Sequence, residues 1–299
     1  MPLDLDRTLH GTAPAKLNLY LEIVGKRADG YHELVSIMQT LDLADALSAR
    51  LVRRAPGEPR VSVVLSGPQA TPEIPTDARN LAVAAALAVL ERAQVAPDIG
   101  IALTLEKHIP AAGGLGGGSS DAASALQLSN RLLDDTLTDT QLHEIAASLG
   151  SDINVFLVGG TVLALGRGER VRAVTPPGDF EATLMLPPFG ARTPEVYAAL
   201  NATPLPPDWS ERAADARGDE IARRVAHADS DALVALFRND LEHAARHVDT
   251  RLGNLLAAPR RRLCGSGSTL IQLGALDADT PRTCESKPIR FLAVRSRKR

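Results

Sequence analysis

Residues 110–120 have the composition of a loop that binds phosphate groups. These eleven residues include five glycines and end on Ser119 and Ser120. Glycine permits unusual backbone dihedral angles and lets the main chain approach a ligand closely. Apolar residues at helical spacing follow, so we expect a helix to begin near Ser120, where free amides and the helix dipole attract negative oxygen atoms. The pattern therefore predicts a phosphate-binding loop at the start of a helix.

Two common nucleotide-binding loops do not fit this stretch. No Gly-Lys-Ser or Gly-Lys-Thr follows the glycines, and the spacing Gly-x-Gly-x-x-Gly is missing, so both the Walker loop and the dinucleotide fingerprint are disfavoured. Asp121, the next residue, suits the positive end of a helix but would repel a phosphate. A flexible linker or a tight turn stays open as the alternative reading.

A strand with chemically useful side chains is predicted over residues 15–24. Apolar residues occupy every second position from Leu17 to Ile23, which is the period of a half-buried strand. Lys16 and Asn18 fall between them, so we expect both side chains to point the same way.

Other elements must position these residues. Residues 34–51 favour strands, residues 80–93 favour a helix, and alternating apolar residues predict a strand over residues 99–105. A further helix is expected to begin at Thr138, where Gln141 completes a capping box, and to end at Gly150. Later segments predict a strand over residues 182–186, helices across residues 220–256, and strands near Thr269 and Phe291.

Composition limits the classes of partner. The chain has 299 residues with 33 basic and 36 acidic side chains, a formal net charge of -3, so no electrostatic footprint for nucleic acid or for an anionic membrane is expected. The apolar run of residues 81–90 is about half a membrane span, and the N-terminus lacks a signal-peptide core. Cys264 and Cys284 are too few for a disulfide framework and suit a reducing compartment, so we expect a cytoplasmic protein.

The length predicts two domains. Composition shifts across residues 159–172, where short strand-like runs follow alanine-rich helices. We place the domain boundary there, which gives an N-terminal domain of residues 1–166 and a C-terminal domain of residues 167–299.

Three motifs together resemble those of the GHMP small-molecule kinases. They are Pro14-Ala15-Lys16-Leu17-Asn18, the glycine-rich loop, and Cys264-Gly265-Ser266-Gly267-Ser268. Residues 25–32 and Gly150-Ser151-Asp152 are similar to the branch that acts on a CDP-linked methylerythritol. The resemblance implies an α+β fold with an N-terminal ATP-binding domain, a C-terminal ferredoxin-like domain, and the active site in the cleft between them.

The resemblance also implies an activity. The branch transfers the γ-phosphoryl group of ATP to the 2-hydroxyl of 4-diphosphocytidyl-2-C-methyl-D-erythritol, a step of the non-mevalonate route to isoprenoid precursors. Its catalytic aspartate falls on Asp152 and its strand lysine on Lys16. ATP arrives as its Mg²⁺ complex; no metal ligand is assigned, although the Ser120 hydroxyl is a candidate.

The binding residues are carried over position by position. Tyr31 would stack on the cytosine ring, His32 would read the edge of the base, and Tyr197 would form the second wall of the sandwich; a core role for Tyr197 stays open. The expected ATP-binding residues are Asn80, Lys107, Pro110, Ala111, Ala112, Gly113, Gly114, Leu115, Gly116, Gly117, Gly118, Ser119 and Ser120. The expected substrate-binding residues are Asn18, Tyr31, His32, Thr193, Tyr197, Gly265, Ser266 and Gly267.

Some positions depart from the family pattern or have ordinary explanations. Asn154 stands where the family commonly has proline, and a lysine at a strand end, such as Lys107, is usually solvated. Arg295 to Arg299 are expected to fray. A kinase of a smaller alcohol such as mevalonate or homoserine, or a relative that has lost transfer, remain alternatives, and a monomer or weak homodimer is expected.

Overall fold

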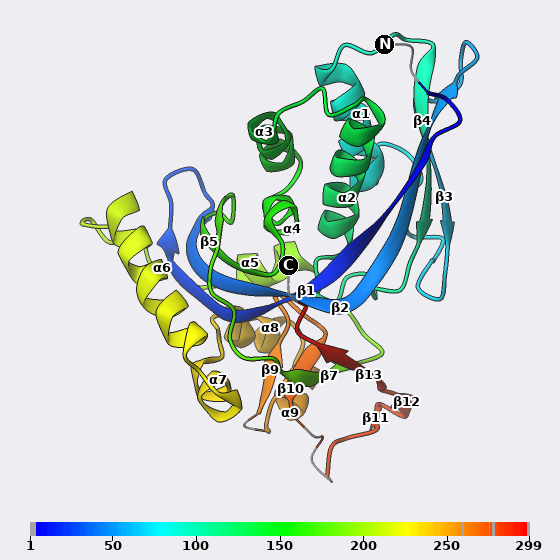
Figure 1. Cartoon of the computed structure of the whole chain (residues 1–299). Coiled ribbons are helices and arrows are strands. Elements are labelled where there is room, and N and C mark those ends of the chain that lie inside the picture. The colour runs from blue at the N-terminus through cyan, green and yellow to red at the C-terminus, as the bar shows by residue number, and fades with distance from the viewer. Residues whose placement is uncertain (1–3, 259, 275, 277–278, 298–299) are drawn as a thin grey trace. The chain divides into compact units, whose positions relative to one another are not determined.

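The computed structural model describes residues 4–258, 260–274, 276 and 279–297, with elements labelled in Figure 1. Two compact units form, and each combines separate stretches of the chain. The first consists of Met1–Ala15, Leu43–Ala111 and Gly116–Leu157, and the second of Lys16–Asp42, Ala112–Leu115 and Val158–Arg299. Because neither unit is one continuous stretch of the chain, this division does not test the expected domain boundary at residue 166, which stays a prediction.

Two long strands, β1 (Thr8–Lys26) and β2 (His32–Arg53), contribute residues to both units. In the first unit, β4 (Ile99–Glu106) pairs with the end of β2 in antiparallel fashion and with β3 (Val61–Ser66) in parallel. The predicted strands are therefore confirmed, and residues 34–51 form one continuous strand.

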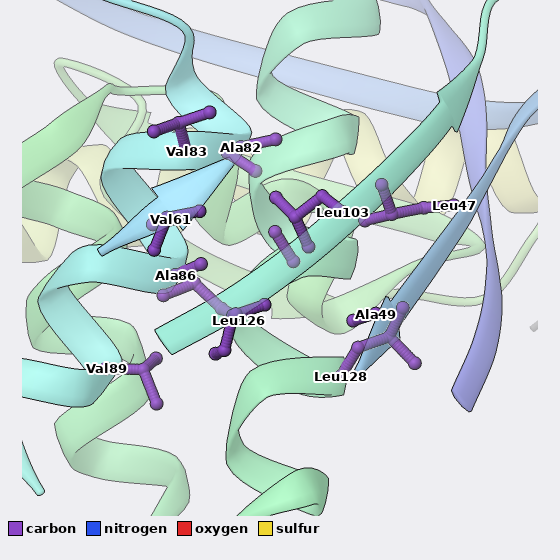
Figure 2. Close-up of a cluster of buried hydrophobic side chains, with 14 of the residues drawn as sticks. Leu47, Ala49, Val61, Ala82, Val83, Ala86, Val89, Leu103, Leu126 and Leu128 are labelled. Atoms are coloured by element: carbon purple, nitrogen blue, oxygen red, sulfur yellow. The ribbon is translucent and has the colours of Figure 1, made fainter. Parts of the chain in front are cut away.

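Helices α1 (Leu81–Arg92), α2 (Gly117–Leu132) and α3 (Asp139–Leu149) complete the first unit, with α4 (Ile153–Val158) after them. In Figure 1, α1 lies beside α2, and it also contacts β3 and β4. Alanines on both helices permit this close approach, and Leu103 of β4 and Leu126 of α2 belong to the same buried cluster (Figure 2). Each fully buried leucine contributes roughly 1.5–3 kcal/mol to stability.

The capping box predicted for α3 is confirmed. The Gln141 amide donates to Thr138 Oγ1 at 3.3 Å, and the Thr138 amide donates to Gln141 Oε1 at 2.9 Å. The helix ends at Gly150, whose amide donates to the Ala146 carbonyl. The turn that carries Asp152 therefore begins directly after a helix end that a hydrogen bond holds in place.

The second unit contains the end of β1 and the start of β2. β5 (Thr161–Gly166) pairs with β2 and with β6 (Arg170–Ala173), while β8 (Arg238–Asn239) pairs with β1. Helix α6 (Glu211–Ala226) packs on β5, and α7 (Ser230–Leu236) follows it.

A separate antiparallel sheet in the same unit has the order β13-β7-β10-β9. Its strands are β7 (Glu181–Leu186), β9 (Arg261–Leu263), β10 (Leu270–Leu273) and β13 (Arg290–Arg295). The helices α5 (Thr193–Ala199), α8 (Leu241–Val248) and α9 (Arg251–Leu255) share its apolar core, which includes Met185 and Leu270. A short pair, β11 (Thr283–Cys284) and β12 (Lys287–Pro288), precedes β13. Mixed helix and sheet layers of this kind are those of an α+β fold.

The expectation of a frayed tail is wrong for Arg295 to Arg297. The Arg295 amide donates to Asp42 Oδ1 and the Arg297 amide to the Thr40 carbonyl, both at 2.9 Å. These bonds tie the end of β13 to residues of β2 within the second unit; residues 298 and 299 lie outside the described residues.

Both cysteines are free thiols, Cys264 buried and Cys284 half-buried. Burial raises the pKa of Cys264 to about 12, so its thiol stays protonated. Among the described residues, no helix combines the length and the apolar character that crossing a membrane requires.

Candidate active site

Strand β1 places Lys16 and Asn18 on one face, as the two-residue period predicts. Lys16 is only 4% exposed, and its Nζ donates to Asn18 Oδ1 at 2.8 Å. Asn18 Nδ2 in turn donates to Ser36 Oγ at 2.9 Å, and Ser36 Oγ donates to the Tyr20 carbonyl at 2.7 Å. This chain of hydrogen bonds holds the lysine side chain in one orientation.

Within the second unit, the glycine-rich loop approaches the turn of residues 264–268. Gly114 has a φ of +76°, and a Cβ added there would lie 1.8 Å from the Cys264 carbonyl oxygen. The Leu115 carbonyl accepts from the Lys16 amide at 2.9 Å. A Cβ on Gly265 would lie 3.4 Å from Lys16 Nζ. The structure therefore brings three predicted motifs together: the loop, the lysine strand and the small-residue turn.

The start of α2 lies in the first unit. Gly116, with a φ of +73°, precedes the helix, which begins at Gly117 rather than near Ser120. Gly118 and Ser119 therefore belong to its first turn, where backbone amides lack partners within the helix. Ser120 is 1% exposed, and its Oγ has no hydrogen-bond partner among the described residues. Contact of Ser120 with ATP stays a prediction.

The rest of the loop varies in burial. Pro110 and Gly113 are buried, whereas Ala111 and Ala112 are exposed. Ala112 adopts a φ of +55°, an uncommon conformation for a residue with a side chain. The backbone at the exposed part of the loop is therefore irregular and belongs to neither a helix nor a strand.

Asn80 and Lys107, which are both expected to contact ATP, are bonded to other residues of the first unit. Asn80 caps α1: its Oδ1 accepts from the Ala82 amide at 3.0 Å and its Nδ2 donates to the Pro75 carbonyl at 2.9 Å. Lys107 is 4% exposed and ion-paired with Asp45 and Asp121. Solvation, the ordinary expectation for a lysine at a strand end, is therefore wrong here, while contacts of Asn80 and Lys107 with ATP stay predictions.

Asp152 precedes α4 and is half-buried. Its carbonyl accepts from the Val155 amide at 3.2 Å, and the Gly150 carbonyl accepts from the Ile153 amide. Asn154 is 3% exposed, with its Oδ1 2.8 Å from Nδ1 of His143 on α3. The side-chain amide of Asn154, at the position where the family commonly has proline, thus links α4 to α3. Asp152 belongs to the first unit and Lys16 to the second, and their joint action stays a prediction.

The aromatic residues lie in the second unit. The rings of His32 and Tyr197 are 5.5 Å apart between centroids and inclined by 39°, whereas Tyr31 is 54% exposed with the Arg167 guanidinium 4.7 Å from its ring centroid. Burial, together with the positive charge of Lys26, lowers the pKa of His32. A neutral imidazole has one donor and one acceptor nitrogen, which suits the edge of a nucleobase.

Helix α5 joins this aromatic pair to the small-residue turn. Thr193 and Tyr197 are four residues apart and share one helix face. Thr193 Oγ1 lies 2.7 Å from Ser266 Oγ, and Asn239 Nδ2 donates to the Gly265 carbonyl at 2.7 Å. The structure therefore links Thr193, Tyr197 and His32 to the turn of residues 264–268.

The chain is similar in sequence to proteins of one enzyme family. A family model described as GHMP kinases N terminal domain matches residues 80–160. A 4-diphosphocytidyl-2-C-methyl-D-erythritol kinase from Heliobacterium modesticaldum is 38% identical over 281 residues, which are 89% of this chain and 86% of the relative. The chain belongs to the 4-diphosphocytidyl-2-C-methyl-D-erythritol kinase family.

Solved structures agree with membership of the 4-diphosphocytidyl-2-C-methyl-D-erythritol kinase family. A crystal structure of 4-(cytidine 5'-diphospho)-2C-methyl-D-erythritol kinase has a TM-score of 0.68 and 30% identity, and covers 96% of this chain and 98% of its own. A homoserine kinase from Cytophaga hutchinsonii has a TM-score of 0.67 at 17% identity, covering 100% and 97%, and shows the fold alone. The expected α+β GHMP kinase fold is thus confirmed, and sequence identity rather than fold separates the two activities.

The sequence reading of this family member missed Asp45. A carboxylate inside the apolar run of residues 34–51 was a usable signal, because a charge in a buried strand requires a partner. The missing information was the partner, since Lys107 lies 62 residues further along the chain. Ser36 and Asn239 were missed as well, and neither belongs to a recognisable local motif.

Proposed function

We propose that this chain transfers the γ-phosphoryl group of ATP to the 2-hydroxyl of 4-diphosphocytidyl-2-C-methyl-D-erythritol, a step of the non-mevalonate route to isoprenoid precursors. The observation that carries the proposal is the 38% identity that extends over most of this chain and of a relative with that name. The buried Lys16 beside the glycine-rich loop and the small-residue turn is the geometry that supports it.

In the proposed mechanism, Asp152 orients the acceptor hydroxyl and takes its proton. Lys16 offsets the negative charge that develops on the transferring phosphoryl group. Its hydrogen bond to Asn18 fixes the ammonium before substrate binds, so little reorganisation is needed during the reaction. Asn18 itself faces the same side and can contact the acceptor.

The glycine-rich loop would hold the ATP phosphates with the amides of the first turn of α2. Ser120, whose Oγ has no hydrogen-bond partner among the described residues, would complete the loop beside the nucleotide. Magnesium, which prefers phosphate oxygens and water as ligands, would neutralise part of the phosphate charge. We propose that the enzyme acts as a monomer or weak homodimer.

CMP is expected to compete with the cytidine substrate, and His32→Ala is expected to weaken CMP binding about tenfold, because a neutral imidazole bonded to the base edge is lost. The KM for ATP should stay within about twofold. Calorimetric titration with CMP measures the change. His227→Ala is the matched control, since that exposed ring lies at the end of α6 with its Nδ1 2.8 Å from the Arg223 carbonyl oxygen of the same helix. Indifference of the wild-type protein to CMP would contradict the assignment of a cytidine subsite.

The function is tested by incubating purified protein with ATP and each acceptor, followed by phosphorus NMR. A new phosphomonoester on 4-diphosphocytidyl-2-C-methyl-D-erythritol, with none on mevalonate or homoserine, is the expected outcome. Transfer to another acceptor would leave a GHMP kinase of different specificity. Binding of ATP without any transfer would favour a noncatalytic relative.

A further inference from the structure

A buried cluster of three charged side chains joins the segments on either side of the glycine-rich loop in the first unit. Asp45 comes from β2, Lys107 follows β4 and Asp121 lies in the first turns of α2. Their side chains are 0%, 5% and 5% exposed. Lys107 Nζ donates to Asp45 Oδ2 and, at 2.6 Å, to Asp121 Oδ2. One ammonium group therefore bridges two carboxylates that are far apart in the sequence.

Asp45 also holds the chain that enters the loop. Its Oδ1 accepts from the His108 amide at 2.5 Å and from the Ile109 amide at 2.8 Å. These amides directly precede Pro110, where the glycine-rich segment begins. Because a carboxylate bonded to backbone amides forms strong, charge-assisted hydrogen bonds, the entry to the loop has a fixed position.

Lys107 connects this entry to the exit. Asp121 immediately follows Ser120, the last residue of the loop, and lies fourteen positions after Lys107. Ordering a flexible loop on binding costs conformational entropy, so a loop whose ends are already fixed binds its ligand more tightly. The cluster removes part of this cost before ATP arrives.

The cluster carries one more negative charge than positive when every group is ionised. Burial and the neighbouring Asp45 raise the pKa of Asp121 to about 7, although Lys107 opposes the shift. Asp121 Oδ1, like the adjacent Ser120 Oγ, has no hydrogen-bond partner in the described part of the chain. A cluster built for stability alone would satisfy its polar atoms, since an unpaired buried oxygen costs about 1–3 kcal/mol.

We propose that Asp45 and Asp121 are positioning residues for the kinase reaction: through Lys107 and the amides of His108 and Ile109, they hold both ends of the glycine-rich loop in the geometry that binds the ATP polyphosphate. This inference rests on the proposed function. It assigns no contact between Asp45 and ATP, because the Asp45 side chain is fully buried. Any effect of Asp45 on ATP binding is transmitted by the groups it touches.

The test compares Asp45→Asn with the wild-type enzyme. Asparagine can still accept from the two loop amides but loses the ion pair with Lys107, so the KM for ATP is expected to rise about tenfold while kcat and the KM for the cytidine substrate stay within about twofold. Asp45→Ala loses both interactions and should raise the KM for ATP further. Asp98→Asn, which removes an exposed ion pair with Arg53 in the same unit, is the matched control and should leave all three constants unchanged.

Asp121→Asn provides an independent measurement if the Asp45 variants do not fold. Removing a negative charge by itself favours polyphosphate binding, so a raised KM for ATP in this variant reports the lost tie to the loop exit. An unchanged or lowered KM would overturn the proposal. Equal increases in the KM values for ATP and the cytidine substrate, or a loss of stability with no change in the KM for ATP, would also overturn it.

Titration with ATP alone separates this proposal from the proposed function. If the wild-type protein binds ATP but phosphorylates no cytidine substrate, the proposed function fails, and the dissociation constants of the variants still test the cluster. Weaker ATP binding in Asp45→Asn with unchanged CMP binding supports the positioning role. If the wild-type protein binds no ATP, both proposals are overturned.

Discussion

Replacing Asp152 with asparagine is expected to lower kcat by roughly two to four orders of magnitude, the range typical of a lost general base. Asparagine has nearly the same shape and can still hydrogen-bond the acceptor hydroxyl, but it cannot take the proton. ATP binding should be retained, because the expected phosphate contacts come from the glycine-rich loop. Steady-state kinetics with saturating cytidine substrate, together with titration of ATP, measures both quantities.

The matched control for this change is Asp139→Asn. Asp139 is an exposed residue in the first turn of α3, in the same unit as Asp152, and the substitution removes the same charge. Its turnover should equal that of the wild-type enzyme. Near-normal turnover of Asp152→Asn would remove Asp152 from the mechanism, and loss of ATP binding in that variant would indicate a structural role instead.

Replacing Gly114 with alanine is expected to destabilise the protein by more than about 3 kcal/mol, because a left-handed backbone and a steric collision add their costs. The new Cβ would lie 1.8 Å from the Cys264 carbonyl oxygen and 3.1 Å from the Gly267 amide nitrogen. Both neighbours are backbone atoms, so no side-chain rotation relieves the collision. Urea denaturation followed by circular dichroism measures the change in the free energy of unfolding.

Gly178→Ala is the control for the chemical change itself. A Cβ at Gly178 meets nothing within 4 Å, and its φ lies outside the left-handed region. The free energy of unfolding should therefore change by no more than about 1 kcal/mol, with a small gain possible from the less flexible unfolded chain. A Gly114→Ala variant as stable as this control would contradict the close approach of the loop to the turn of residues 264–268.

Local patterns predicted much of the fold. The alternation around Lys16 predicted a strand with Lys16 and Asn18 on one face, and the Thr138 and Gln141 pair predicted a helix start; both predictions are confirmed. These features depend on residues within a few positions of one another. The motifs around Gly114 and Gly265 were also recognisable, because glycine permits backbone conformations and close approaches that other residues do not.

The features that sequence reasoning did not reach depend on distant partners. Lys107 was expected to contact ATP, with solvation as its ordinary explanation, and only the fold reveals its two buried carboxylate partners. The roles of Asp45 and Asn239 are likewise set by residues from other elements. For Tyr31, the motif identified the residue, but the contact of its ring with Arg167 became visible only in the structure. A periodic pattern specifies which face of an element is buried, whereas the contact across that face requires the tertiary structure.

The discontinuous composition of the two compact units has a consequence for synthesis on the ribosome. Every residue of the first unit lies before residue 158, so that unit can be completed while the remainder of the chain is still being translated. Residues 16–42 belong to the second unit, yet β9 and β10 of that unit emerge only after residue 260. The end of β1 and the start of β2 find their partner strands β8 and β5 before then. The apolar core that Leu21 of β1 shares with β9 and β10 stays incomplete during this interval, so a protective chaperone contact would have its greatest effect there.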